Sequence, residues 1–327
     1  MIVASRIQRA ASRSVGRGLC NVTSHLMNIR VLGIPLDLGQ ARRGVDMGPS
    51  AVRAAGLNSV LRALGHRVED AGNIHVRIAE EQHFGDKRVK YLKEIAQTCR
   101  EAADRVYQTV VDGWFPISLG GDHSIAVGTH AGVSRLFRER RQPIGCIWID
   151  AHADMNTPDT SPSGNIHGMP FAASLGFGPK ELTRIFNFAP KLRAPNCALV
   201  GLRDLDSRER RSVKQSSVHA FTMRDIDEHG LRAVMEKSIA AATNGTAGFV
   251  VSLDMDVVDP REAPGVGTPV PGGITFREAH LIMEMISDTK KMLALEIVEV
   301  NPIIDVLNRT AALAVGLAAS ALGKKIL

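Results

Sequence analysis

Aromatic residues and cysteines are scarce in this 327-residue chain, and neither kind forms a pattern. Aromatic side chains make up 4% of the residues, which leaves few platforms on which single-stranded bases could stack. We therefore expect no nucleic-acid partner. The cysteines are far apart and show no Cys-x-x-Cys spacing, so we expect reduced thiols and no disulfide framework; they are Cys20, Cys99, Cys146 and Cys197.

Long apolar runs are also missing. A membrane span needs roughly 18 consecutive apolar residues, and the nearest candidate, residues 310–323, is shorter and reads as a buried terminal helix. The overall composition, 44% hydrophobic and 23% charged residues, is ordinary for a globular enzyme and argues against a largely disordered chain. We expect a real core and no membrane partner.

Acidic residues are absent from the first 30 positions, although the whole chain carries a formal charge of +6. The same stretch is rich in Ser and Ala, and its five arginines account for most of the net charge of the chain: Arg6, Arg9, Arg13, Arg17 and Arg30. This composition is typical of a mitochondrial transit peptide and lacks the continuous apolar region of a secretory signal. Residues 1–27 are therefore predicted to direct the protein to the mitochondrial matrix. A disordered tail or a misassigned start, with a cytoplasmic protein, is the alternative.

Beyond residue 27, short apolar runs alternate with helix-like stretches. Continuous apolar runs suit strands that are covered on both faces, as in a parallel sheet. They lie at 28–39, 114–123, 143–154, 197–206, 248–260 and 292–302. Residues 89–113 have helical spacing, and Thr275 with Glu278 forms a possible capping box at the start of another helix. We predict one catalytic domain over 28–327, a three-layer αβα sandwich around a mostly parallel sheet.

Polar clusters sit at the carboxyl ends of three of these runs, where open parallel sheets bind their ligands. They supply six candidate metal ligands, His123, Asp150, His152, Asp154, Asp254 and Asp256. If residues 150–154 were extended, their alternation would place the three polar side chains on one side. Four carboxylates this close need compensating charge, which a pair of divalent cations supplies. Mixed carboxylate and imidazole ligation without thiolates favours Mn²⁺ or a similar ion.

Several separated motifs resemble the ureohydrolase family, and specifically its arginases. They are DLGQARRGVDMGPSAVR (37–53), GGDHS (120–124), DAHADMN (150–156), SGNIHGMP (163–170), SLDMDVVDP (252–260), GVGTPVPGG (265–273) and EVNP (299–302). The resemblance covers the chain from about Asn28 to its end. It implies the αβα fold reached above and hydrolysis of L-arginine to L-ornithine and urea by a hydroxide that bridges two Mn²⁺ ions per subunit.

The resemblance also implies roles for the six ligands. Asp150 and Asp254 would bridge the two ions, His123 and Asp154 would complete one coordination shell, and His152 and Asp256 the other. His167 would donate a proton to the departing amine, as imidazole can near neutral pH. Glu299 would orient the guanidinium by charge-assisted hydrogen bonds.

Other matching positions would bind the α-amino-acid end of the substrate. Asn156, Ser163 and Asn165 resemble the segment that contacts the α-carboxylate. Asp206 resembles the residue that faces the α-ammonium, Asp204 would support it, and Thr268 would line the site.

Two alternatives stay open at this point. One is agmatinase or another ureohydrolase with a guanidino substrate, and the other is a non-catalytic, metal-stabilised oligomer. The family resemblance implies a homo-oligomer, either a trimer or a hexamer.

Overall fold

The computed structural model describes residues 26–325. The predicted targeting segment, residues 1–27, falls outside this range except at its last two positions, and so does Cys20. The segment's role therefore stays a prediction.

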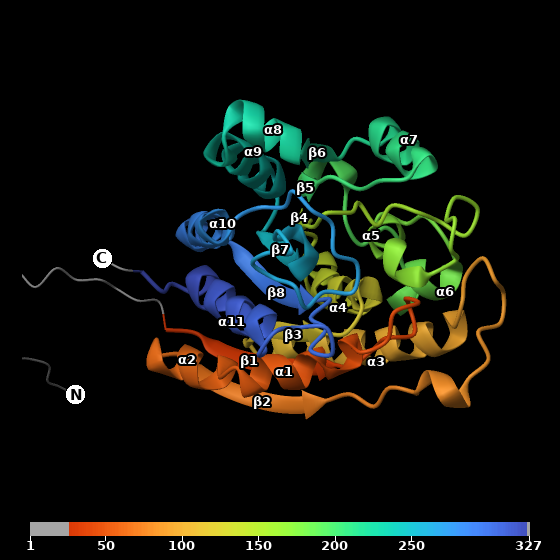
Figure 1. The fold of residues 1–327 in the computed structure, drawn as a ribbon, viewed down its shortest axis with the longest axis horizontal. Helices are drawn as coiled ribbons and strands as arrows, with labels where there is room; N and C mark the ends of the chain where they lie inside the picture. The colour runs from red at the N-terminus through yellow and green to blue at the C-terminus, as the bar shows by residue number, and fades with distance from the viewer. Residues whose placement is uncertain (1–25, 326–327) are drawn as a thin grey trace, which may run out of the picture.

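One sheet of eight parallel strands forms the middle layer, in the order β2-β1-β3-β8-β7-β4-β5-β6. Figure 1 shows it running from β2 at the bottom of the view to β6 at the top. The strands are β1 (Asn28–Ile34), β2 (Arg67–Asn73), β3 (Phe115–Gly120), β4 (Gly145–Ile149), β5 (Cys197–Leu202), β6 (His219–Thr222), β7 (Phe249–Asp254) and β8 (Met292–Val298).

Each central strand is buried on both faces, and successive side chains enter opposite cores. In β4, Ile147 and Ile149 belong to one hydrophobic core, whereas Cys146 and Trp148 belong to the other. A strand with helices on both sides has no face left for polar residues, which is why these segments read as continuous apolar runs. The predicted three-layer αβα fold is confirmed.

Helices cover both faces of the sheet. The core on one face includes residues of α1 (Gly48–Ala54), α2 (Leu57–Ala63), α8 (Met223–His229), α9 (Leu231–Thr243), α10 (Phe276–Thr289) and α11 (Arg309–Ala321). The other face packs against α3 (Leu92–Val111), α4 (Ala126–Glu139), α5 (Pro170–Ser174), α6 (Lys180–Thr183) and α7 (Ser207–Gln215).

Several expected elements are present with small changes at their ends. Residues 89–113 contain α3, and the expected terminal helix is α11, which is mostly buried. The capping box forms as predicted, because the side chain of Thr275 accepts from the amide of Glu278 and the Glu278 carboxylate accepts from the amide of Thr275. Between residues 26 and 325, no helix is both long and apolar enough to cross a membrane.

The two edge strands, β2 and β6, were not predicted from the sequence. An edge strand pairs on one side only, and β2, with the sequence RVEDAGN, leaves most of its residues exposed or half-buried. Such strands lack the continuous apolar run that marks the interior of a parallel sheet. The predicted free thiols are confirmed for the cysteines in the described residues, because Cys99, Cys146 and Cys197 are buried and unpaired.

Candidate metal centre and adjoining pocket

The candidate ligands follow strands that are neighbours in the sheet although they are far apart in sequence. β3, β7 and β4 lead to His123, Asp254 and Asp150, and β8 lies between β3 and β7 and leads to Glu299. All these strands are parallel, so their carboxyl ends meet at one edge. This topology is what gathers the polar clusters into one place.

The turn after β3 depends on a glycine and a capping aspartate. A Cβ atom on Gly121 would lie 1.8 Å from the backbone oxygen of Leu36, so no larger residue fits without moving the chain. Asp122 accepts from the amide of Ser124 at 2.9 Å and from the amide of Gly39 at 2.8 Å. These contacts fix the backbone that presents His123.

The first cluster surrounds one imidazole nitrogen with three carboxylates. Nδ1 of His123 lies 3.2 Å from Oδ2 of Asp150, 3.2 Å from Oδ2 of Asp154 and 3.1 Å from Oδ2 of Asp254. All four side chains are buried. Despite these distances, Nδ1 makes no hydrogen bond of acceptable geometry. A single proton could point at only one of the three oxygens.

The second cluster is built on His152 and shares a residue with the first. Nδ1 of His152 lies 3.0 Å from Oδ2 of Asp256 and 3.4 Å from Oδ1 of Asp150. Asp150 therefore turns one carboxylate oxygen toward each imidazole. His123, Asp150 and Asp254 in one group, and Asp150, His152 and Asp256 in the other, bring their ligand atoms close enough to hold a metal ion.

The two clusters contain more carboxylates than imidazoles. Burial alone would raise the pKa of Asp150, but the two imidazoles close to its carboxylate hold the pKa below its usual value. Burial and the neighbouring Asp150 carboxylate raise the pKa of Asp154 to about 6, and burial with Asp256 and Asp150 raises that of Asp254 well above normal. The carboxylates cannot all stay ionised without added positive charge.

A pair of divalent cations fits this arrangement. Burial alone would lower the pKa of His123, yet its three carboxylate neighbours raise it well above the ordinary value. The same field that favours a proton at this position favours a metal cation, and binding a cation releases the proton. The unsatisfied Nδ1 of His123 and the oxygen-rich donor set suit a first-row ion such as Mn²⁺.

The geometry expected for residues 150–154 was wrong in one respect. These residues are not extended, because β4 ends at Ile149 and Asp154 has a left-handed backbone with φ 51°. The turn directs Asp154 to His123 while His152 faces Asp256. The ligands converge through tertiary folding and not through strand alternation.

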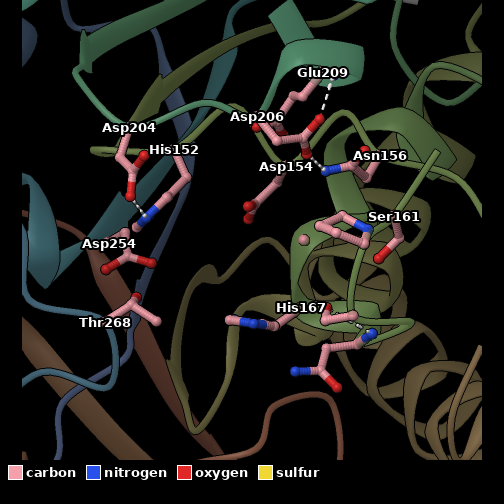
Figure 2. Close-up of a pocket in the computed structure, with 14 residues that line it drawn as sticks. His152, Asp154, Asn156, Ser161, His167, Asp204, Asp206, Glu209, Asp254 and Thr268 are labelled. Carbon is pink, nitrogen blue, oxygen red and sulfur yellow. Dashed lines mark hydrogen bonds and ion pairs between the residues drawn. The ribbon is translucent and has the colours of Figure 1, made fainter.

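A pocket of about 750 Å³, including its open mouth, adjoins the two clusters. In Figure 2, His152, Asp154, Asp254 and His167 reach the same space from different sides. Other lining residues predicted from the sequence are Asn156, Ser163, Asn165, Asp204, Asp206 and Thr268. Thr268 also donates a hydrogen bond of 3.0 Å to Oδ2 of Asp256. The structure thus brings together the metal-ligand candidates and the substrate-binding candidates.

One side of the pocket is fixed by the start of α7. Asp206 accepts from Nδ2 of Asn156 at 2.8 Å, and its other oxygen caps the helix by accepting from the amides of Arg208 and Glu209. The capping contacts hold the pKa of Asp206 below its usual value although burial opposes this. The expected support from Asp204 is not seen, because the carboxylate of Asp204 instead lies 4.0 Å from Nε2 of His152.

His167 and Glu299 form a pair, but only His167 lines the pocket. Nδ1 of His167 lies 3.5 Å from Oε1 of Glu299, and this carboxylate raises the pKa of the imidazole although burial opposes the effect. Glu299 is fully buried, with a left-handed φ of 64°. It accepts from the amide of His123 at 3.0 Å and from Nε2 of Gln40 at 3.2 Å. Glu299 does not line the pocket itself.

Several residues that shape the site were not predicted from the sequence. Glu209 lines the pocket and accepts from the amide of Met155 at 3.0 Å; burial and the nearby Asp154 carboxylate raise its pKa to about 8. Its position three residues after the capping Asp206 is a helix-start signal that could have pointed to it. Arg203 holds backbone oxygens around Asp256, and no local pattern indicates that role.

The fold and the two clusters define an α/β protein with a site suited to a pair of divalent cations. The profile of the Arginase family matches residues 27–323. The chain is 48% identical to the arginase of Bacillus caldovelox over 300 residues, covering 91% of this chain and 99% of that protein. It is also 48% identical to the arginase of Brevibacillus brevis over 301 residues, covering 92% and 99%.

A comparison with solved structures leads to the same family as the sequence comparisons. The crystal structure of Bacillus caldovelox arginase at pH 5.6 superposes with a TM-score of 0.89 and 48% identity, covering 92% of this chain and 100% of that one. The protein described here belongs to the arginase family.

Proposed function

We propose that this chain hydrolyses the guanidinium group of L-arginine and releases L-ornithine and urea. Its family membership and its high identity to arginases along nearly the whole described chain support this function. The observation that carries it is the position of Asp150. One oxygen of this carboxylate faces His123 and the other faces His152, beside a pocket with further polar groups for an amino acid.

His123, Asp150, Asp154 and Asp254 would hold one cation, and His152 with Asp150, Asp254 and Asp256 would hold the other. When bound, such a pair of cations supplies a water whose pKa is lowered toward neutrality and which can attack the guanidinium carbon. The burial of these ligands strengthens their electrostatic interactions with charge in the site.

We propose that His167 donates a proton to the departing amine. Its ring lines the pocket, and the Glu299 carboxylate raises its pKa, which favours the protonated imidazole. Glu299 acts through this imidazole and through its acceptance from the amide of His123. We propose that it also supplies negative charge near the guanidinium.

The other end of the pocket suits an α-amino acid. Asp206 is a carboxylate with a lowered pKa and can attract an α-ammonium group. Asn156, Ser163 and Asn165 offer polar groups for an α-carboxylate. Lys90 donates to Oδ1 of Asn165 at 3.1 Å, which directs the amide and adds positive charge near that end.

A parallel assay of the purified protein with Mn²⁺ tests this function. Urea release is measured with arginine, agmatine and guanidinobutyrate, and ornithine is measured with arginine. Arginine should be the preferred substrate. Hydrolysis of agmatine without hydrolysis of arginine would instead identify an agmatinase, and absence of turnover with every substrate would favour a non-catalytic protein.

Mn²⁺ as the native metal, two ions per subunit, is part of this proposal. Its basis is the donor set, which contains oxygen and imidazole nitrogen and no thiolate. Metal analysis of protein purified without added metal, followed by activity with Mn²⁺, Co²⁺, Ni²⁺ or Zn²⁺, tests it. Full activity with another ion and weak activity with Mn²⁺ would contradict the assignment.

We further propose a homo-oligomer, trimer or hexamer, in the mitochondrial matrix. The oligomer follows from the family resemblance, and light scattering of the purified protein measures its mass. The location depends on the arginine-rich composition of residues 1–27. Imaging the full chain beside a chain lacking residues 1–27 tests it, since only the full chain should enter mitochondria; a cytoplasmic full chain would support the alternative.

A further inference from the structure

A buried hydrogen-bonded chain leads from the first metal-ligand cluster into the interior of the sheet. Nε2 of His123 lies 2.6 Å from Oγ of Ser252, and Oγ of Ser252 donates to Oε1 of Glu296 at 2.5 Å. Thr129, on α4, donates to the other oxygen of Glu296. All four side chains are buried, and Glu296 does not line the pocket beside the clusters. Oε1 of Glu296 also lies 4.0 Å from Nε2 of His123, so Glu296 acts on the metal site from behind this imidazole, directly and through Ser252.

The direction of these hydrogen bonds follows from the chemistry of their groups. A serine hydroxyl has one hydrogen, and Ser252 donates it to Oε1 of Glu296. The oxygen of Ser252 is then left to accept from His123, which requires a hydrogen on Nε2. The lone pair of the neutral imidazole is consequently on Nδ1, the atom that faces Asp150, Asp154 and Asp254.

Further polar groups lie around the carboxylate of Glu296. Besides the two hydroxyl donors, Nε2 of His130 lies 3.6 Å from Oε1 of Glu296, and Nδ1 of His130 lies 2.9 Å from Oγ of Ser174. Burial lowers the pKa of His130, which favours the neutral ring. A ring that accepts from Ser174 carries its hydrogen on Nε2, directed to the Glu296 side.

We propose that Glu296 is a positioning residue for metal binding. Through Ser252 it fixes the tautomer and orientation of His123 so that Nδ1 is ready to bind a cation. Partners behind a ligating histidine commonly fix its tautomer and change metal affinity by about 10- to 100-fold when removed. This role rests on the metal site of the proposed function and concerns only the ion near His123, because His152 has no contact with this chain of hydrogen bonds.

Glu296→Gln is the first test, since it keeps the size of the side chain. The amide of glutamine can donate as well as accept, so the direction of the Ser252 hydrogen bond is no longer fixed. We expect the affinity for one Mn²⁺ per subunit to fall by about tenfold or more, while the second ion stays bound. The readout is Mn²⁺ retained after dialysis against graded free-metal concentrations.

Ser252→Ala tests the same link from its other end and replaces the first variant if Glu296→Gln does not fold. It should weaken the same single ion. Ser134→Ala is the matched control, because it also removes one buried hydroxyl, whose hydrogen bond goes to the backbone oxygen of Lys191. The control should retain both ions. Thermal unfolding of the metal-free variants separates lost stability from lost affinity.

Two outcomes would overturn the inference. One is a Glu296→Gln protein that folds and retains both ions as tightly as the wild type. The other is an equal loss of both ions in Glu296→Gln, Ser252→Ala and Ser134→Ala, which would mean that these side chains serve only general stability. A wild-type protein that binds two ions but releases no urea would contradict the proposed function and leave this inference standing.

Discussion

The indole of Trp148 stacks on the imidazole of His123, with ring centroids 4.0 Å apart and planes inclined by 9°. The same indole donates from Nε1 to Oδ2 of Asp150 at 2.9 Å. One buried side chain at the end of β4 thus restrains both a histidine and a shared carboxylate of the candidate metal centre. Although β4 is an apolar strand, its Trp148 side chain contributes to the candidate metal centre.

Replacing this indole should weaken metal binding more than it weakens the fold. Trp148→Phe keeps an aromatic face against His123 but removes the donor to Asp150, so Mn²⁺ affinity should fall by about tenfold. Metal titration measures the change, and circular dichroism checks the fold. Unchanged affinity in a folded variant would show that the hydrogen bond from Nε1 is dispensable.

Removing the metal should destabilise the protein. The carboxylates of Asp150, Asp154, Asp254 and Asp256 gather around two imidazoles, and negative groups packed in this way repel one another unless cations lie between them. A ligand present at 100 times its dissociation constant stabilises the folded state by about 2.7 kcal/mol per site. Thermal unfolding after chelation should begin at a lower temperature and recover on adding Mn²⁺. Equal melting temperatures would argue against a bound pair.

Asp206 should distinguish arginine from agmatine. Its carboxylate is predicted to attract the α-ammonium group, and it also caps α7. Asp206→Asn removes the charge but leaves an oxygen that can cap the helix, so KM for arginine should rise more than KM for agmatine. Asp206→Ala additionally loses the cap, at a cost of about 1 kcal/mol in unfolding free energy. An equal rise in KM for both substrates in the Asn variant would separate Asp206 from the ammonium group.

Arg203 should be needed for the shape of the pocket. Its guanidinium donates to the backbone oxygen of Val270 at 2.7 Å, that of Val257 at 3.1 Å and that of Asp256 at 2.6 Å. Arg203→Lys keeps the charge but cannot span three oxygens in this plane. We expect a loss of about 2 kcal/mol in unfolding free energy and a higher KM, measured by denaturant titration and steady-state kinetics. Wild-type values for both would contradict this role.

Lys191 should make stability depend on alkaline pH. Burial lowers the pKa of Lys191 to about 8 in the folded protein, from 10.5 in an unfolded chain. Between these values the unfolded chain binds more protons, so the contribution of this residue to stability rises with pH, by about 3 kcal/mol over the window. Lys191→Met should lack this component in denaturant titrations from pH 8 to 10.5. Identical slopes for both proteins would contradict it.

The interior strands of the sheet, and the metal-binding chemistry of the residues at their ends, could be predicted from the amino-acid sequence. Strands such as β4 and β7 carry apolar residues on both faces because helices cover both faces. The resulting continuous apolar run can be recognised in the sequence. Their polar ends, including Asp150 and Asp254, identified the metal-ligand candidates without any coordinates. The edge strands β2 and β6 were missed because half-exposed strands carry a mixed pattern.

Which of these side chains come into contact depends on the tertiary structure. Strand order places β8 between β3 and β7, which puts Glu296 behind Ser252 and Glu299 beside His167. The left-handed backbone at Asp154, and not strand alternation, turns this carboxylate toward His123. Local sequence patterns encode burial and backbone preference, whereas contacts between residues on different strands depend on the packing of the whole sheet. These partners could therefore not be predicted from the sequence alone.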